Sequence, residues 1–310
     1  MISDLFTVTV LVGILASGIR LSTPYLFAAI GETFGQKSGV LNLGVEGQML
    51  LGAFAAFYVA LTTGNLWLGL LTAMLVGALM GLAMAYVTVN LHAEQGISGI
   101  GFYLFGLGMS DLLFQKLMGT VETVKGFPEV YFPFLSDIPG IGKIFFSQNI
   151  LVYIAYLLVP IAWFVLNKTT LGLKIRSVGE NPDAADSLGV SVARIRYFTI
   201  ILGGTLSGVA GASMSIALLN VFQQNMTSGL GFIAVALVYF GAWRPIGVLG
   251  GALLFSLINS LQLWVQVLSI PIPSDIAVMM PYVVTILVLV ATVSKVRAPS
   301  ALTKPFERGD

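Results

Sequence analysis

The sequence predicts an all-α polytopic membrane protein with about nine transmembrane helices, within a range of roughly eight to ten. Of its 310 residues, 57% are hydrophobic and only 9% are charged, whereas a soluble domain has about 25% charged residues. The apolar residues gather in runs, and a membrane helix needs roughly 20 of them. The alternating strands of about ten residues that build membrane barrels are absent from the sequence. Lipid is therefore the expected solvent of this chain.

Each predicted span is bounded by polar residues, glycine or proline. Backbone groups in lipid must be paired within their own segment, so every span is predicted to be a helix. The first run contains Arg20 and Pro24 and can form one helix or two shorter ones. The seventh run is short and also fits a broken or re-entrant helix. The spans are predicted at residues 5–30, 46–62, 66–89, 97–115, 150–166, 197–219, 230–242, 246–268 and 277–294.

Basic residues near the span ends predict the orientation, because lysine and arginine concentrate in cytoplasmic loops. The loop 167–196 and the C-terminal tail are rich in both, so both are predicted to be cytoplasmic. The even number of spans between them agrees with a shared side. Counting backwards places the loop 116–149 and the N-terminus outside the cell. The whole chain, residues 1–310, is predicted to be one transmembrane domain.

Composition also limits the chemistry. The chain has no cysteine and one histidine, His92, which excludes thiolate sites and multi-histidine metal sites. The net charge of +1 creates no field that would draw nucleic acid. The sequence has no GxxxxGKS/T motif, so any ATP and magnesium would be used by another chain. We expect no catalytic residue, metal site or bound cofactor in this chain.

A glycine-rich polar segment, residues 31–48, leads directly into an apolar span. Irregular backbone at membrane depth persists only where protein buries it or a water-filled cavity adjoins it. Asn42 and Glu46 are four residues apart and share a helix face. A carboxylate at the start of a membrane helix is costly unless it is paired or hydrated. Glu46 therefore either lines a solute pathway with Asn42 and Gln48, or ties loop amides together and caps a helix.

A short capped helix is predicted inside the loop 167–196. Asn181 and Pro182 have the pattern of an N-cap followed by proline at the first helical position. Gly189 has the character of a C-terminal stop. A helix of about two turns is too short to be stable alone, so we expect it to dock on a soluble partner. The residues assigned to this docking are Glu180, Asn181, Pro182, Asp183, Ala184, Ala185, Asp186, Leu188 and Gly189.

Three amide side chains, Gln223, Gln224 and Asn225, follow a clean span on the predicted outer side. Amides both donate and accept hydrogen bonds, which suits an uncharged polyhydroxyl or heterocyclic solute. These residues are candidate solute contacts, and an ordinary polar outer turn is the alternative.

Other residues concern packing and anchoring. Arg20 is expected to extend to a membrane interface or to pair with Glu32 or Glu46. Trp243 is expected to anchor at an interface. Glycines four residues apart predict close packing between helices, with a dimer seam as the alternative. These glycine pairs are Gly77 and Gly81, Gly204 and Gly208, and Gly247 and Gly251.

Three motifs resemble those of a known family. Residues 38–48, Ser-Gly-Val-Leu-Asn-Leu-Gly-Val-Glu-Gly-Gln, look like the SGxxNxGxEGxM signature of bacterial ABC importer permeases. Residues 179–189 resemble the cytoplasmic coupling loop of that family, GENPxAAxxxG. Residues 229–236, with Pro245 downstream, resemble its GxGFxxIAVAxxG…P pattern. The chain is most similar to the purine-nucleoside branch, which is linked to basic membrane lipoproteins.

This resemblance implies the transmembrane permease subunit of an ABC importer for a small polar solute. Nucleosides are the first expectation, and a monosaccharide or a branched-chain amino acid is the alternative. The implied partners are an ABC ATPase subunit, a second permease chain that is homologous but different, an extracytoplasmic solute-binding lipoprotein and the lipid of a bacterial plasma membrane. Residues 181–189 would be the coupling helix that moves with the ATPase.

Two other classes of protein fit the sequence less well. An ion-coupled secondary transporter would need an acidic relay across several spans, and Glu46 with Asp111 is a thin one. An intramembrane serine protease is suggested by the GxSG pattern at residues 96–99. Its serine would need a base from another helix, and the only histidine, His92, lies in the adjoining polar turn.

Overall fold

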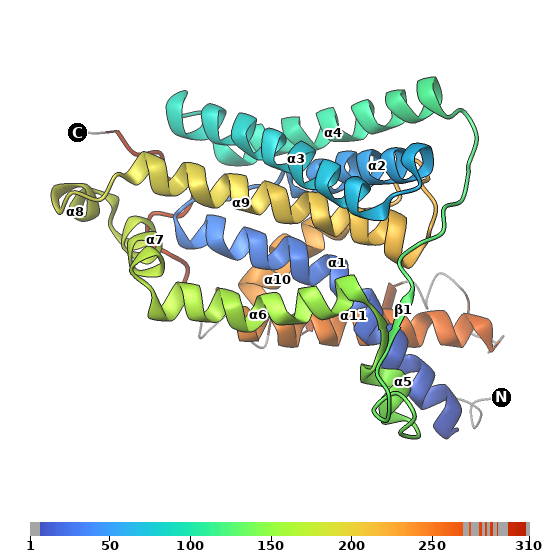
Figure 1. The fold of residues 1–310 in the computed structure, drawn as a ribbon. Coiled ribbons are helices and arrows are strands. Elements are labelled where there is room, and N and C mark those ends of the chain that lie inside the picture. Colours follow the sequence, from blue (N-terminus) through green and yellow to red (C-terminus); the bar gives the residue numbers. More distant parts are fainter. Residues whose placement is uncertain are drawn as a thin grey trace.

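A computed structural model shows a bundle of long helices (Figure 1). The structure describes residues 7–268 and 297–307, together with residues 273, 279, 280, 283, 286, 287 and 290. In chain order the elements are α1 (Val8–Lys37), α2 (Val45–Thr63), α3 (Leu66–Ala85), η2 (Tyr86–Asn90), α4 (Gln95–Leu117), β1 (Glu129–Tyr131), α5 (Ile141–Phe145), β2 (Ser147–Asn149), α6 (Ile150–Lys168), α7 (Thr170–Glu180), α8 (Pro182–Ser187), α9 (Val192–Ser213), η3 (Met214–Leu218), α10 (Leu230–Phe240) and α11 (Pro245–Val267), where η marks a π-helical turn.

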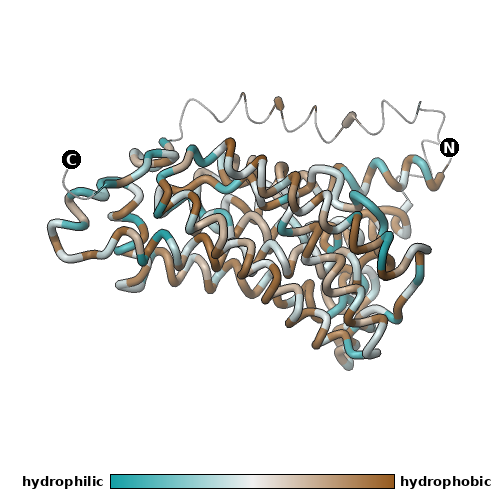
Figure 2. Tube along the Cα trace, turned by 90° about the horizontal axis from the view of Figure 1, so that it is seen from above, coloured by the Kyte–Doolittle hydropathy of each residue, from teal (hydrophilic) through white to brown (hydrophobic). Residues whose placement is uncertain are grey.

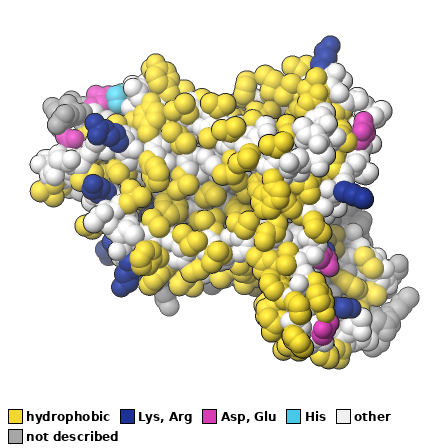
Figure 3. Space-filling model, in the orientation of Figure 1, with side chains coloured by type: hydrophobic (Ala, Val, Ile, Leu, Met, Phe, Trp, Pro, Cys, Tyr) yellow, Lys and Arg dark blue, Asp and Glu magenta, His cyan; other side chains and the backbone are white. Residues whose placement is uncertain are grey.

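Seven helices in the described part of the chain are long and apolar enough to cross a membrane. On the face shown in Figure 3, hydrophobic side chains cover the middle of the molecule and charged side chains lie toward its two ends. Hydrophobic residues likewise run along the length of the bundle in Figure 2. The prediction of a polytopic helical membrane protein is confirmed at this level. The seven helices are α1, α2, α3 with η2, α4, α6, α9 with η3, and α11.

The ends of several predicted spans are corrected. The first run forms one helix, so the alternative of two shorter helices is wrong, although Pro24 lies inside α1. This helix continues to Lys37, and only residues 38–44 of the predicted irregular segment are non-helical. The Glu32 carboxylate accepts a hydrogen bond from Gln36 Nε2 one turn later, which suits the helical conformation there. The predicted span 277–294 lies largely outside the described residues.

The predicted cytoplasmic loop 167–196 is also more regular than expected. α9 begins at Val192, so its first turn occupies the end of this loop. The remainder forms α7 and α8, which lie at the same end of the bundle as the C-terminal segment (Figure 1). The seventh predicted span is confirmed as a short helix, α10.

α9 packs against α1, α2 and α3 at the centre of the bundle. Its contact with α3 runs through predicted glycine pairs: a Cβ at Gly77 would lie 2.2 Å from the Gly204 carbonyl oxygen, and one at Gly204 would lie 2.4 Å from the Gly77 carbonyl oxygen. The backbones of these helices therefore touch directly, as small residues allow in membranes. The prediction of close helix packing is confirmed within one chain.

The predicted extracellular loop 116–149 contains the two strands of the described structure. β1 and β2 pair antiparallel, with Glu129 opposite Asn149. The short helix α5 precedes β2, and this segment lies near the end of the bundle where the chain begins (Figure 1). Apart from this three-residue pairing, the regular elements of the described chain are helices.

Candidate functional site

The predicted capped helix is present as α8. Asn181 ends α7 and begins α8, and its Oδ1 accepts a hydrogen bond from the Ala184 backbone N–H at 3.0 Å. Pro182 occupies the first turn, as predicted. After Leu188 the chain turns at Gly189, whose φ of 82° lies in the left-handed region that favours glycine. The capping pattern is therefore confirmed, while docking on a partner stays a prediction.

The helix α7 was missed from the sequence. Thr169 caps it, because its Oγ1 accepts from the Gly172 backbone N–H at 3.1 Å. The signal that could have revealed it is the Thr-Thr-Leu-Gly start at residues 169–172, together with the helical spacing of the apolar residues Leu171, Ile175 and Val178. The far end of α7 lies against the end of α1: a Cβ at Gly179 would be 2.1 Å from the Lys37 carbonyl oxygen. The backbones of α7 and α1 therefore touch at this point.

An apolar groove of about 490 Å³ separates α7 from α8. Leu188 is 85% exposed and Leu173 is 59% exposed beside it. These two leucines enlarge the apolar surface of the groove, and a partner that covers it stays a prediction. Ala185 of α8 is buried, on the side of the helix that packs against the rest of the protein. The groove is lined by Thr170, Leu173, Lys174, Ser177, Glu180, Asn181, Ala184, Ala185, Leu188 and Val190.

The C-terminal segment 297–307 ties this element to the rest of the bundle. Ser300 Oγ donates to Glu180 Oε2 at 3.1 Å, and the Ala301 backbone N–H donates to the Gly179 carbonyl at 2.9 Å. Two residues later, the Thr303 backbone N–H donates to the Gly39 carbonyl at 3.1 Å. The end of α7 and the irregular segment 38–44 are therefore joined by one strap.

Residues 38–44 are irregular but buried in protein. Ser38 Oγ shares a hydrogen bond with Thr199 Oγ1 of α9 at 2.7 Å. The Leu41 backbone N–H donates to Gln95 Oε1 of α4 at 2.8 Å, and the Asn42 N–H donates to Glu32 Oε1 of α1 at 3.0 Å. Side chains of α4 and α1 thus accept from two backbone N–H groups of this segment, and the N–H groups of residues 38–40 donate to carbonyls at the end of α1.

Asn42 and Gln48, two of the predicted pathway residues, bond to each other. Asn42 Nδ2 donates to Gln48 Oε1 at 3.2 Å, and Asn42 Oδ1 accepts from the Gly44 backbone N–H at 2.9 Å. Asn42 is 3% exposed and Gln48 is fully buried. In this conformation both amides brace the turn into α2, and their contact with a solute stays a prediction.

Glu46 lies in the first turn of α2 and is 1% exposed. Its Oε1 accepts from Thr227 Oγ1 at 2.5 Å and from the Gly229 backbone N–H at 2.7 Å. Its Oε2 accepts from the Gly231 backbone N–H at 2.5 Å. The carboxylate therefore caps α10, and this geometry matches the capping alternative for Glu46.

The other predicted pathway residues, Gln223, Gln224 and Asn225, are all exposed in the turn between η3 and α10. They lie a few residues before Thr227, which donates to the Glu46 carboxylate. The structure thus connects two sets of candidate residues that are about 180 positions apart, through Thr227, Gly229 and Gly231.

Comparison with known proteins agrees with these motifs. Residues 14–289 match the family model described as "Branched-chain amino acid transport system / permease component". The chain belongs to this family. The ABC permease resemblance inferred from its motifs is therefore confirmed.

Three relatives align with the permease over almost their whole length. The putative glucose ABC transporter permease protein TsgC13 of Haloferax volcanii is 37% identical over 96% of this chain and 98% of the relative. The guanosine ABC transporter permease protein NupQ of Bacillus subtilis is 38% identical over 93% of this chain and 94% of the relative. The nucleoside ABC transporter permease protein NupC of Lactococcus lactis subsp. cremoris is 40% identical over the same shares. No solved structure is significantly similar to the permease.

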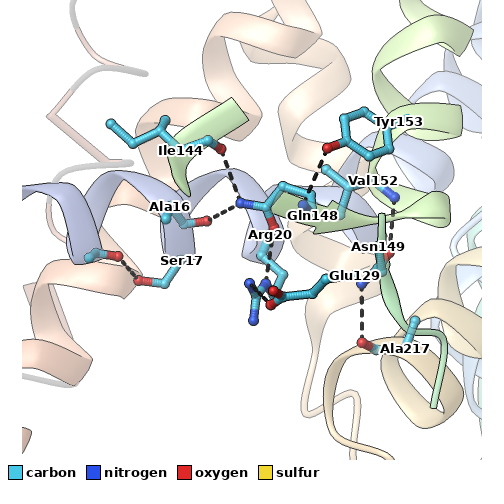
Figure 4. Close-up of polar contacts among 11 residues, drawn as sticks. Ala16, Ser17, Arg20, Glu129, Ile144, Gln148, Asn149, Val152, Tyr153 and Ala217 are labelled. Atoms are coloured by element: carbon cyan, nitrogen blue, oxygen red, sulfur yellow. Dashed lines mark hydrogen bonds and ion pairs between the residues drawn. The ribbon is translucent and has the colours of Figure 1, made fainter. Parts of the chain in front are cut away.

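The position of Arg20 corrects a prediction for this permease. Figure 4 shows Arg20 of α1 directed at the β-ribbon, where its Nη2 donates to Glu129 Oε1 at 3.0 Å and its Nε donates to Gln148 Oε1 at 3.1 Å. It pairs with neither Glu32 nor Glu46. Glu32 is twelve residues further along α1, or about 18 Å along the helix axis. Arg20 therefore fastens the segment 118–149 to the bundle.

Trp243 also departs from its prediction in the permease. It is 1% exposed, and its indole Nε1 donates to Gln36 Oε1 at 2.7 Å. A buried indole N–H needs an acceptor, and Gln36 supplies one in the last turn of α1. Trp243 therefore joins the α10–α11 turn to α1 and is not exposed as an interface anchor.

Proposed function

We propose that this permease forms the translocation pathway of an importer for nucleosides, driven by ATP hydrolysis in a separate subunit. The observation that carries the choice of solute is the pair of relatives named for guanosine and nucleoside, each aligned over 93% of the chain. The exposed amides at residues 223–225 support it, because they can donate to and accept from ring nitrogens and hydroxyl groups.

A monosaccharide is the second candidate, because the relative named for glucose aligns over 96% of the chain. A branched-chain amino acid fits the geometry less well. Such a solute carries a carboxylate, which helix N-termini inside a membrane protein can hold. At the N-terminus of α10 that position is filled by the carboxylate of Glu46.

The α7–α8 element is the proposed coupling site for the ATPase. Its groove is apolar, and two leucines that line it, Leu173 and Leu188, are exposed. The assigned residues Glu180 to Gly189 begin at the contact with the C-terminal strap. ATP-driven movement of the docked ATPase would reach α1 through Gly179, since no space separates it from Lys37.

The basic residues around α7 and α8 support a cytoplasmic position for this end of the bundle. The segment 118–149 and the N-terminus would then face outward in a bacterial plasma membrane. ATP and magnesium belong to the partner ATPase in this proposal. A second, homologous permease chain would complete the pathway, and an extracytoplasmic lipoprotein would deliver the solute.

Coupling is tested by Leu188→Arg, at a side chain that is 85% exposed and so can change without disturbing the core. Co-purification of the ATPase with the permease should fall at least tenfold. The matched control is Phe134→Arg, which is 87% exposed in the segment 118–149 at the other end of the molecule. Equal ATPase recovery with both variants would remove α8 from the docking surface.

The solute is tested with the assembled transporter in proteoliposomes. Guanosine and adenosine uptake should require the ATPase and ATP, and unlabelled nucleosides should compete while glucose and leucine should not. Uptake against a gradient without the ATPase would support an ion-coupled transporter instead. Competition by glucose alone would replace nucleosides with the second candidate.

A further inference from the structure

Glu46 caps a helix that cannot cap itself. The N-cap position of α10 is Gly229, which has no side chain to accept a hydrogen bond. Its φ of 90° lies in the left-handed region, so a Ser, Thr, Asp or Asn cap would be strained there. The orphan N–H groups of Gly229 and Gly231 are instead bonded by Glu46, from another helix.

This cap lies well inside the bundle. Gly47, the next residue, touches α4 at Phe102: a Cβ at Gly47 would be 2.5 Å from the Phe102 carbonyl oxygen. Gly106 of α4 lies equally close to Gly47. These contacts fall roughly 7 to 11 residues into α4, or about 10–17 Å from its start. Glu46 itself starts α2, so its negative charge lies where the positive ends of two helices meet.

Within the described chain, each oxygen of the Glu46 carboxylate accepts from a backbone N–H, and Oε1 also accepts from a hydroxyl. These donors are the Thr227 hydroxyl and the backbone N–H groups of Gly229 and Gly231. A carboxylate is an acceptor only, and a glutamine of the same shape would turn an NH₂ group toward at least one of these donors. The site therefore suits a side chain with two acceptor oxygens, which a carboxylate has and an amide lacks.

The cap and a buried aromatic residue hold the two ends of one segment. At one end Phe222 is fully buried, with its ring centroid 5.3 Å from that of Phe54 and 5.6 Å from that of Phe114. At the other end Thr227 is fully buried against Glu46. Between these anchors the chain turns outward, with Asn225 in the left-handed region at φ 52°. We call residues 222–227 the amide arch, because it exposes Gln223, Gln224 and Asn225.

We infer that Glu46 is a positioning residue: its carboxylate fixes the amide arch so that the three exposed amides face the solute, and Glu46 itself does not touch the solute. This inference rests on the proposed importer function for the role of the amides. The fixation of the arch by Glu46 is independent of that function and can be measured on the permease alone.

The test replaces Glu46 with glutamine and follows the arch with a single cysteine. Because the chain has no cysteine, Asn225→Cys provides a unique label site. In purified permease, Glu46→Gln should change the rate of maleimide labelling at this cysteine at least threefold. In the assembled transporter without the cysteine, the same substitution should raise KM for nucleoside about tenfold or more, which is equivalent to about 1.4 kcal/mol of solute binding.

The matched control is Glu32→Gln. Glu32 is also a buried carboxylate, but its two side-chain hydrogen bonds from described residues, those of Gln36 Nε2 and the Asn42 N–H, both go to Oε1. A glutamine oxygen can keep both. Labelling and KM should therefore remain at the wild-type values in this variant.

Thr227→Val provides a second variant if Glu46→Gln does not accumulate. It removes one donor to Glu46 with little change in shape, and labelling should change in the same direction by a smaller factor. Wild-type labelling in Glu46→Gln, or in Thr227→Val when it is the only folded variant, would overturn the inference. If Glu46→Gln changes the labelling rate but the wild-type transporter takes up no nucleoside, the positioning role stands and the proposed solute is rejected.

Discussion

Two helices of this permease, α4 and α10, are capped at their N-termini by a glutamate carboxylate. One glutamate is a sequence neighbour of its helix, and the other is far away in the chain. α4 is capped by Glu94, which accepts from the Gly96 N–H at 3.0 Å and the Ile97 N–H at 2.5 Å. α10 is capped by Glu46, which lies 185 residues before the Gly231 N–H that it bonds. Glu94 is exposed and Glu46 is 1% exposed.

The difference shows that capping by a carboxylate has different consequences at an exposed local site and at a buried distant one. Water can replace the exposed local cap of Glu94, so its loss is confined to the first turn of α4. Water has little access to Glu46, so its loss leaves buried donors unpaired. A distant cap also joins two helices, and here it fixes the segment between them. The buried cap should therefore be far more sensitive to substitution than the exposed one.

The largest effect in this comparison is expected from Gly231→Ala. A Cβ at this position would lie 2.6 Å from both Cα and N of Glu46, which are backbone atoms that cannot rotate away. Overpacking of this kind costs about 1–3 kcal/mol, and the melting temperature of the detergent-solubilised permease should fall. Gly250→Ala, where no atom lies within 4 Å, is the control and should leave it unchanged or slightly higher. Equal melting temperatures would show that the α2–α10 contact is loose.

An intermediate effect is expected from Asn181→Ala, which removes a local cap from a helix of six residues. Loss of an N-cap costs about 1 kcal/mol, so amide hydrogen exchange across residues 184–188 should become roughly fivefold faster. Asn181→Asp keeps an acceptor and should exchange as slowly as the wild type. Faster exchange in both variants would mean that the fold of α8 depends on the amide group itself.

The smallest effect is expected from loss of the Glu94 cap, and it can be followed by varying the pH. The backbone N–H groups of Ile97 and Gly96 hold the pKa of this carboxyl below its ordinary value of 4.5. The capping contribution is therefore present above pH 4.5 and is lost as the pH falls through the lowered pKa of the folded protein. The amide chemical shift of Ile97 should titrate below pH 4.5, and Glu94→Gln should abolish the titration. A midpoint at or above 4.5 would show that the cap is not formed.

Local patterns were sufficient for much of the fold. Long apolar runs predicted seven of the described helices, and the Asn181-Pro182 pair predicted the start of α8, because these signals lie within a few residues of what they control. The α7 helix was missed because its lysine, arginine and glycine residues suggested a basic loop. The continuation of α1 to Lys37 was missed because Glu32 and Gln36 suggested irregular structure, whereas they pair within the helix.

The candidate sites divide in the same way. The coupling residues are contiguous, so one stretch of sequence could indicate all of them. The partners of Arg20, Trp243 and Glu46 are more than 100 residues away in each case. No spacing rule connects such residues, and for that reason the expected pairing of Arg20 and the expected exposure of Trp243 were wrong.

The sequence by itself determined that this chain is a helical membrane protein with a short capped helix, because composition, span length and capping depend on near neighbours. Only the tertiary structure decided that the carboxylate of Glu46 caps α10 and that residues 38–44 are buried rather than open. Both depend on which helices meet inside the bundle, where each unpaired donor must find an acceptor that water cannot provide.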